Sequence, residues 1–97
     1  MRSLLWTDQA RGDLAAIREF VSRDSAHYAD IVVARLIAAV DRIARFPESG
    51  RVVPEFADAS LREVIWRPYR IVYRLVGPDR IHIVTVHHEA RRFPADV

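Results

Sequence analysis

The sequence contains no cysteine among its 97 residues. This absence excludes a disulfide framework and thiolate chemistry, whether nucleophilic or metal-binding, and it fits a reducing compartment. Lysine is absent too, so all fifteen basic residues are arginines, yet the formal net charge is only +2. A charge this small permits an anionic partner without requiring one.

Long apolar runs are also missing. No stretch approaches the ~18 residues that a membrane-spanning helix needs. The N-terminus "MRSLLWTDQ" has too short an apolar run for a signal peptide. We therefore expect a cytoplasmic protein without membrane contact. The length fits a single domain over residues 1–97, and a hydrophobic fraction of 51% supplies its core.

The residues that are present form an α+β pattern. Segment 2–6 is typical of a short strand, and Thr7 after it is a suitable helix N-cap. Apolar residues then recur at helical spacing over 10–21 and again over 29–43, and Pro47 ends the second helix. Two helices joined by a short turn predict a helical hairpin.

Three β-prone runs follow the helices, at 61–66, 70–76 and 80–88. The turn residues 77–79, Gly-Pro-Asp, join the last two runs into a hairpin. The last run is apolar on both faces, which is typical of a central strand. We predict an N-terminal strand and an α-helical hairpin packed on a mostly antiparallel sheet, in the order β-α-α-β-β-β, with a small extra strand near residue 52.

Arginines recur on one face of the predicted sheet. Strand alternation places Arg70 and Arg74 on the face turned away from the helices. Turning Arg62 outward as well would gather three cations there, at the cost of sending Glu63 inward and Trp66 outward. We expect a cationic outer face of Arg62, Arg70 and Arg74. The alternative is that Arg62 and Arg74 form ordinary surface ion pairs with Glu63, Glu55 or Asp79.

The histidines at the end of the last strand do not form an obvious metal site. His87 and His88 are neighbours in a strand, so their side chains point to opposite faces. Without cysteine or a histidine–carboxylate pair at helical spacing, we expect no metal site. The sequence also carries no phosphate-binding or dinucleotide-binding glycine motif, so we expect no cofactor.

Several motifs occur together in a characteristic order. They are "FPESGR" at 46–51, "LREV" at 61–64, "YRIVYRL" at 69–75 and "RIHIVTVHHEARR" at 80–92. With these motifs the chain resembles the RelE/ParE toxin superfamily of type II toxin–antitoxin systems over nearly its whole length. The residues of the motifs are more similar to the ParE-like branch. The resemblance implies a small α+β toxin that a cognate antitoxin neutralises within a hetero-oligomeric complex.

Two activities are implied by the two branches. ParE-like members interfere with DNA gyrase, whereas RelE-like members cleave mRNA on the ribosome without a metal. For the RelE-like activity, Arg62 and Arg70 match basic positions of the branch, and His87 or His88 would act as acid or base.

The chain departs from the RelE-like pattern at two places. Val64 stands where that branch has a second lysine, and no tyrosine follows Tyr73. We therefore expect interference with gyrase, with the ribosome-dependent mRNA endonuclease as the alternative. A toxin without activity that serves only as a partner of its antitoxin is a third possibility.

Candidate binding residues follow from these expectations. The candidates for contact with the target are cationic residues of the outer face and its rim, namely Arg70, Arg74, His88, Arg91 and Arg92. The candidates for contact with the antitoxin are apolar residues that widen the helical stripes beyond what a core needs, namely Phe20, Val21, Val33 and Ile37. The alternative is that the arginines are solvated and the apolar residues belong to the core.

Overall fold

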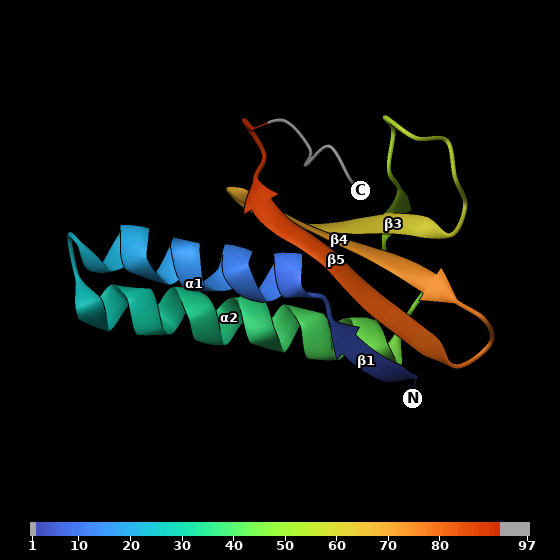
Figure 1. Cartoon of the computed structure of the whole chain (residues 1–97), viewed down its shortest axis with the longest axis horizontal. Helices are drawn as coiled ribbons and strands as arrows, with labels where there is room; N and C mark the ends of the chain where they lie inside the picture. Colours follow the sequence, from blue (N-terminus) through green and yellow to red (C-terminus); the bar gives the residue numbers. More distant parts are fainter. Residues whose placement is uncertain (1, 92–97) are drawn as a thin grey trace.

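The computed structural model describes residues 2–91 and contains two helices on a five-stranded sheet. The elements in chain order are β1 (Ser3–Trp6), α1 (Asp8–Ser22), α2 (Ala26–Arg45), β2 (Arg51–Val52), β3 (Leu61–Trp66), β4 (Tyr69–Val76) and β5 (Arg80–His88). Figure 1 shows α1 and α2 side by side as a hairpin, with the sheet crossing one end of it. The predicted α+β architecture is confirmed.

The strands are arranged in the order β1-β5-β4-β3-β2. β1 runs parallel to β5, and the remaining neighbours are antiparallel. β5 therefore lies inside the sheet, as its two apolar faces predicted. β2 is the small extra strand after the helices.

Side-chain caps start both helices. The Thr7 hydroxyl accepts a hydrogen bond from the Ala10 backbone at 3.1 Å, and the Ser25 hydroxyl accepts one from Tyr28 at 3.0 Å. Each cap satisfies a backbone donor that the first turn leaves open. Within the part of the chain that the structure describes, no helix has the length and apolar character needed to cross a bilayer.

The start of α1 also closes an open edge of β5. β1 pairs only with the first residues of β5, as far as Ile83. Beyond that point the Thr7 hydroxyl donates to the Ile83 carbonyl at 2.7 Å, and the Asp13 carboxylate accepts from the Val86 backbone at 3.1 Å and from the Thr85 hydroxyl. Side chains of the helix thus satisfy backbone groups that a neighbouring strand would otherwise pair.

The core has two parts on the two faces of the sheet. The larger part lies between the helices and the sheet, and its fully buried members include Leu36, Val40, Ile71, Tyr73, Ile81 and Ile83. The smaller part lies on the opposite face and consists of Val53, Leu61 and Val72. Val53 begins a segment, residues 53–60, that folds back over this face. The face expected to be open is therefore partly covered.

The expected grouping of Arg62 with Arg70 and Arg74 is wrong. The register pairs Arg62 with Tyr73, which places Arg62 on the face that the helices cover. Its guanidinium donates to the Gly50 carbonyl at 3.2 Å. Glu63 lies on the face of Arg70 instead, because burial there is compensated by ion pairs. Trp66 accordingly packs towards the helices and not outward.

The turn after α2 is fixed by a buried tyrosine. The Tyr73 hydroxyl donates to the Pro47 carbonyl at 2.6 Å and accepts from the Gly50 backbone at 3.0 Å. A Cβ atom at Gly50 would lie 2.5 Å from the Tyr73 oxygen and 2.7 Å from the Glu63 carbonyl oxygen. Real Cβ atoms do not approach other atoms so closely, so only glycine fits here without a shift.

Gly50→Ala is expected to lower the free energy of unfolding by about 1–3 kcal/mol, because the methyl group overpacks a buried site. Gly12→Ala is the matched control. It lies in α1 with nothing within 4 Å of its added Cβ, and removing a helical glycine should stabilise by up to about 1 kcal/mol. Urea denaturation followed by circular dichroism measures both. Effects of the same sign would contradict this account of the turn.

Candidate functional site

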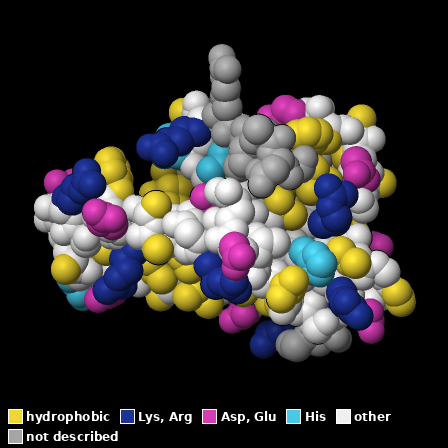
Figure 2. Space-filling view, in the orientation of Figure 1, with side chains coloured by type: hydrophobic (Ala, Val, Ile, Leu, Met, Phe, Trp, Pro, Cys, Tyr) yellow, Lys and Arg dark blue, Asp and Glu magenta, His cyan; other side chains and the backbone are white. Residues whose placement is uncertain are grey.

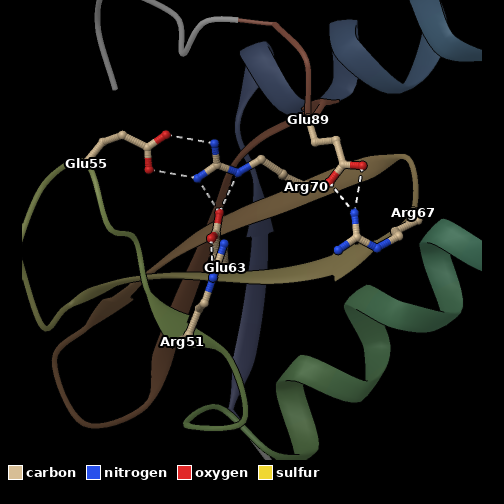
Figure 3. Close-up of polar contacts among 6 residues, drawn as sticks. All are labelled: Arg51, Glu55, Glu63, Arg67, Arg70 and Glu89. Carbon is tan, nitrogen blue, oxygen red and sulfur yellow. Dashed lines mark hydrogen bonds and ion pairs between the residues drawn. The ribbon is translucent and has the colours of Figure 1, made fainter.

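Four charged side chains form a continuous chain of ion pairs on the sheet face opposite the helices (Figure 3). Glu63 accepts from Arg51 Nε at 2.6 Å and from Arg70 Nε at 2.6 Å. The two terminal nitrogens of Arg70 donate to the two oxygens of Glu55, at 2.8 and 3.0 Å. We call Arg51, Glu55, Glu63 and Arg70 the ion cluster. Its members come from β2, the 53–60 segment, β3 and β4.

The centre of the ion cluster is buried. The side chain of Glu63 is 0% exposed and that of Arg70 is 9% exposed, whereas Arg51 and Glu55 reach solvent. The hydrogen bond from Arg70 lowers the pKa of Glu55, and the same bond raises the pKa of Arg70. With its carboxylates ionised the cluster carries two positive and two negative charges, so its net charge is zero.

His87 lies directly across from Arg70 on β5. It is 9% exposed. Burial, and after it the nearby charge of Arg70, lower the pKa of His87. The imidazole is therefore neutral at physiological pH. The structure thus brings together Arg70 and His87, two of the residues that the nuclease alternative requires. It adds Glu55 and Glu63 beside them, which were expected only as surface partners of Arg62 and Arg74.

The remaining candidates for target contact are dispersed. Arg74 lies on the face of Arg70 but pairs with Asp58 at 3.1 Å. His88 points to the opposite face, where its ring lies edge-on to Tyr69 with centroids 6.0 Å apart. Arg91 is exposed and makes no ion pair within residues 2–91, and Arg92 lies outside the described residues. Figure 2 likewise shows arginines scattered among acidic side chains on the face it displays.

The candidates for antitoxin contact lie on the helical hairpin. Phe20 is 63% exposed and Ile37 is 40% exposed, while Val21 and Val33 are half-buried. Val21 also packs against the main core. The closed end of the hairpin extends past the sheet in Figure 1, so the sheet does not lie over it. Phe20 and Ile37 are therefore the two of this set that offer apolar surface.

Potential metal ligands do not converge in the described part of the chain. Among residues 2–91, no three histidine or carboxylate side chains form a group that could hold a metal ion. The carboxylates of the ion cluster are bonded to arginines instead.

Arg70→Ala is expected to lower the free energy of unfolding by about 3 kcal/mol or more, because it leaves the buried Glu63 carboxylate with too little compensation. Arg67→Ala is the matched control. It removes an exposed arginine that pairs with Glu89 at 2.9 Å, and such pairs contribute at most about 1 kcal/mol. Urea denaturation of the two variants measures the difference. Equal losses would mean that the ion cluster is not specifically stabilising.

The lowered pKa of His87 predicts how the stability of the fold depends on pH. Its pKa in the folded chain lies below the ordinary value of 6.5, so unfolding lets it take up a proton that the folded state resists. The free energy of unfolding should therefore fall as the pH drops below about 6.5. His87→Gln should flatten this dependence between pH 7.5 and 5 in chemical denaturation. An unchanged slope would contradict it.

Comparisons with known proteins agree over nearly the whole chain. A sequence model described as "ParE toxin of type II toxin-antitoxin system, parDE" matches residues 4–93. "Toxin RelE2" of Caulobacter vibrioides is 36% identical over 91 residues, which cover 94% of this chain and 99% of that protein. "Putative toxin Y4kP" of Sinorhizobium fredii is 35% identical over 95 residues, which cover 96% of this chain and 94% of that protein.

The fold is also shared with a solved structure. A chain of a chromosomal ParDE toxin–antitoxin system from P. aeruginosa superposes with a TM-score of 0.75 at 24% sequence identity, over 91% of this chain and 96% of that one. Since the family model and both relatives extend over almost all of the sequence, this chain belongs to the ParE toxin family of type II toxin–antitoxin systems.

Proposed function

We propose that this toxin inhibits growth by interfering with DNA gyrase and that its cognate antitoxin neutralises it in a hetero-oligomeric complex. The choice of target rests on one observation, the burial of Arg70 in ion pairs. Its guanidinium is bonded to two carboxylates and is almost completely buried. A residue held in this way supports the sheet and is poorly placed to bind a substrate.

The alternative activity would need cations that an RNA phosphate can reach. Cleavage through the adjacent 2′-hydroxyl builds negative charge on the scissile phosphate, which must be stabilised at the site. Here a phosphate would have to displace Glu55 from Arg70, and Arg62 lies on the other face of the sheet with its donors on backbone carbonyls. The zero net charge of the ion cluster also gives no attraction for a polyanion.

The exposed cations of the rim are the residues that we assign to target contact. Arg91 is exposed, and so is His88 at the end of β5, directly before Glu89 and Ala90 turn the chain. Arg91 and Arg92 would present positive charge to gyrase or to the DNA that gyrase holds, and His88 would offer a polar contact beside them. Arg74 contributes less, because Asp58 neutralises it.

One observation favours the ribosome-dependent mRNA endonuclease as a second candidate. Arg70, His87 and the solvent-reaching Glu55 lie together on one sheet face, which is a combination of a cation, an acid–base imidazole and a carboxylate. The name of the Caulobacter vibrioides relative, "Toxin RelE2", points the same way. The lowered pKa of His87 opposes a role as general acid, which must be protonated, but not a role as general base.

Induced expression of the chain is expected to relax a supercoiled reporter plasmid while the messages of the cell remain intact. Gyrase assays with the purified chain should show the same inhibition. Arg91→Ala should raise the concentration needed for half-inhibition about tenfold, the loss typical of an important interface arginine. Arg80→Ala, an equally exposed arginine at the opposite end of β5, is the matched control and should leave inhibition unchanged.

Mapping of RNA 5′ ends in the same cultures distinguishes the two candidates. Cuts with codon periodicity in translated messages, lost in Glu55→Gln but retained in Arg91→Ala, would replace gyrase with mRNA as the target. Intact messages together with normal supercoiling would contradict both candidates and favour an inactive toxin.

A further inference from the structure

The C-terminal end of α2 carries two shallow hollows that share one aromatic wall. The larger, of about 600 Å³, lies beside Arg2, Arg45 and Phe46. The smaller, of about 370 Å³, lies beside Ala38, Arg42 and the same Phe46. The phenyl ring thus separates two depressions at the helix end. Neither hollow touches a member of the ion cluster or a residue assigned above to target contact.

Phe46 presents its ring to solvent. The residue is 56% exposed and takes no part in either core cluster. The guanidinium of Arg42 lies 5.8 Å from the ring centroid, within the range of a cation–π contact. An exposed aromatic ring that an arginine holds in place is an anchor typical of protein interfaces, whose most important residues are aromatic and arginine side chains.

The positive charge at the hollows is not neutralised by ion pairs. Seven arginines of the described chain pair with carboxylates: Arg11, Arg18, Arg23, Arg51, Arg67, Arg70 and Arg74. Within residues 2–91, Arg2, Arg42 and Arg45 make no such pair, although they gather at this one place.

A purely structural reason accounts for only part of this arrangement. Arg42 and Arg45 lie in the last turn of α2, where cations interact favourably with the helix dipole. Arg2 comes from the start of the sheet and has no such role, and the dipole does not explain an exposed phenyl ring. Two carboxylates, Asp41 and Glu48, also line the hollows. They leave a small positive excess, which suits a peptide with acidic side chains better than a nucleic acid.

We propose that the antitoxin docks on the surface formed by Arg2, Arg42, Arg45 and Phe46, which we call the Phe46 surface. The docking segment of the antitoxin carries acidic residues next to an apolar one. The carboxylates of the segment pair with the arginines, and its apolar side chain packs on Phe46. A second copy of the chain would bring the same cations together, so self-association through this surface is disfavoured. The proposal rests on the toxin–antitoxin family and does not depend on which target the toxin inhibits.

The position of the Phe46 surface extends the contact expected on the helices. Ile37, exposed on α2, precedes Phe46 by nine residues, or about 13 Å along a helix. Nine residues are about two and a half helical turns, so the two places lie on opposite sides of α2, and an antitoxin that contacts both must wrap around the helix. Linking two modest contacts in one chain raises the total affinity well above either alone.

Titration calorimetry of the purified toxin with its cognate antitoxin tests the proposal. Phe46→Ala and Arg45→Glu are each expected to raise the dissociation constant at least tenfold, and Arg45→Gln should raise it less than Arg45→Glu. Arg80→Glu is the matched control. It reverses an exposed charge on a residue that, within residues 2–91, forms no ion pair and lies outside both hollows, so its dissociation constant should stay within twofold.

Phe46 and Arg45 are exposed, so Phe46→Ala and Arg45→Glu should keep the melting temperature of the parent chain. A change in binding then reports on the surface and not on unfolding. The expected phenotype is growth arrest that co-expression of the antitoxin no longer relieves. Unchanged dissociation constants for both Phe46→Ala and Arg45→Glu would overturn the proposal. Retained antitoxin binding with lost growth inhibition would also overturn it and assign the surface to the target, while a change in self-association would assign it to a second copy.

Discussion

The half of the chain that follows the helices is organised around one buried carboxylate. Glu63 is inaccessible to solvent, and its two oxygens are held by arginines from two different strands. Arg51 links β2 to Glu63. Arg70 links Glu63 to Glu55, which lies in the segment that covers the smaller core. A buried charge is tolerated only with such compensation, so the position of each partner is linked to the others.

This linkage gives Arg70, a candidate catalytic residue of the nuclease alternative, a structural role. Removing Arg70 would loosen β2 and the 53–60 segment as well as any site on the sheet face, because its guanidinium bonds both carboxylates. Loss of toxicity after that change would not identify a nuclease. Arg91, which is exposed and makes no ion pair within residues 2–91, separates function from stability more clearly.

The elements themselves were predictable from local patterns, whereas the pairing of side chains across strands was not. Helical spacing of apolar residues predicts both helices, with Thr7 as the cap of the first, and β-prone runs predict β3, β4 and β5. The predicted face of Arg62 is wrong because that prediction takes no account of the turn between β3 and β4. Arg67 and Pro68 alone connect β3 to β4, and a turn of two residues fixes the register that pairs Trp66 with Tyr69. With that register, Glu63 becomes a diagonal neighbour of Arg70 and the ion cluster could have been expected.

The contact between α1 and β5 has a consequence for how the sheet meets other chains. An uncovered strand edge is a template on which a foreign strand can add, and natural proteins protect such edges. Here the protection beyond β1 comes from the N-cap Thr7 and from Asp13 of α1, which bond backbone groups of β5. α1 also packs Leu14 and Ile17 against the main core, so exposing this edge would require moving the whole helix and not only breaking these hydrogen bonds. As long as α1 stays docked, a foreign strand cannot add to this edge of β5.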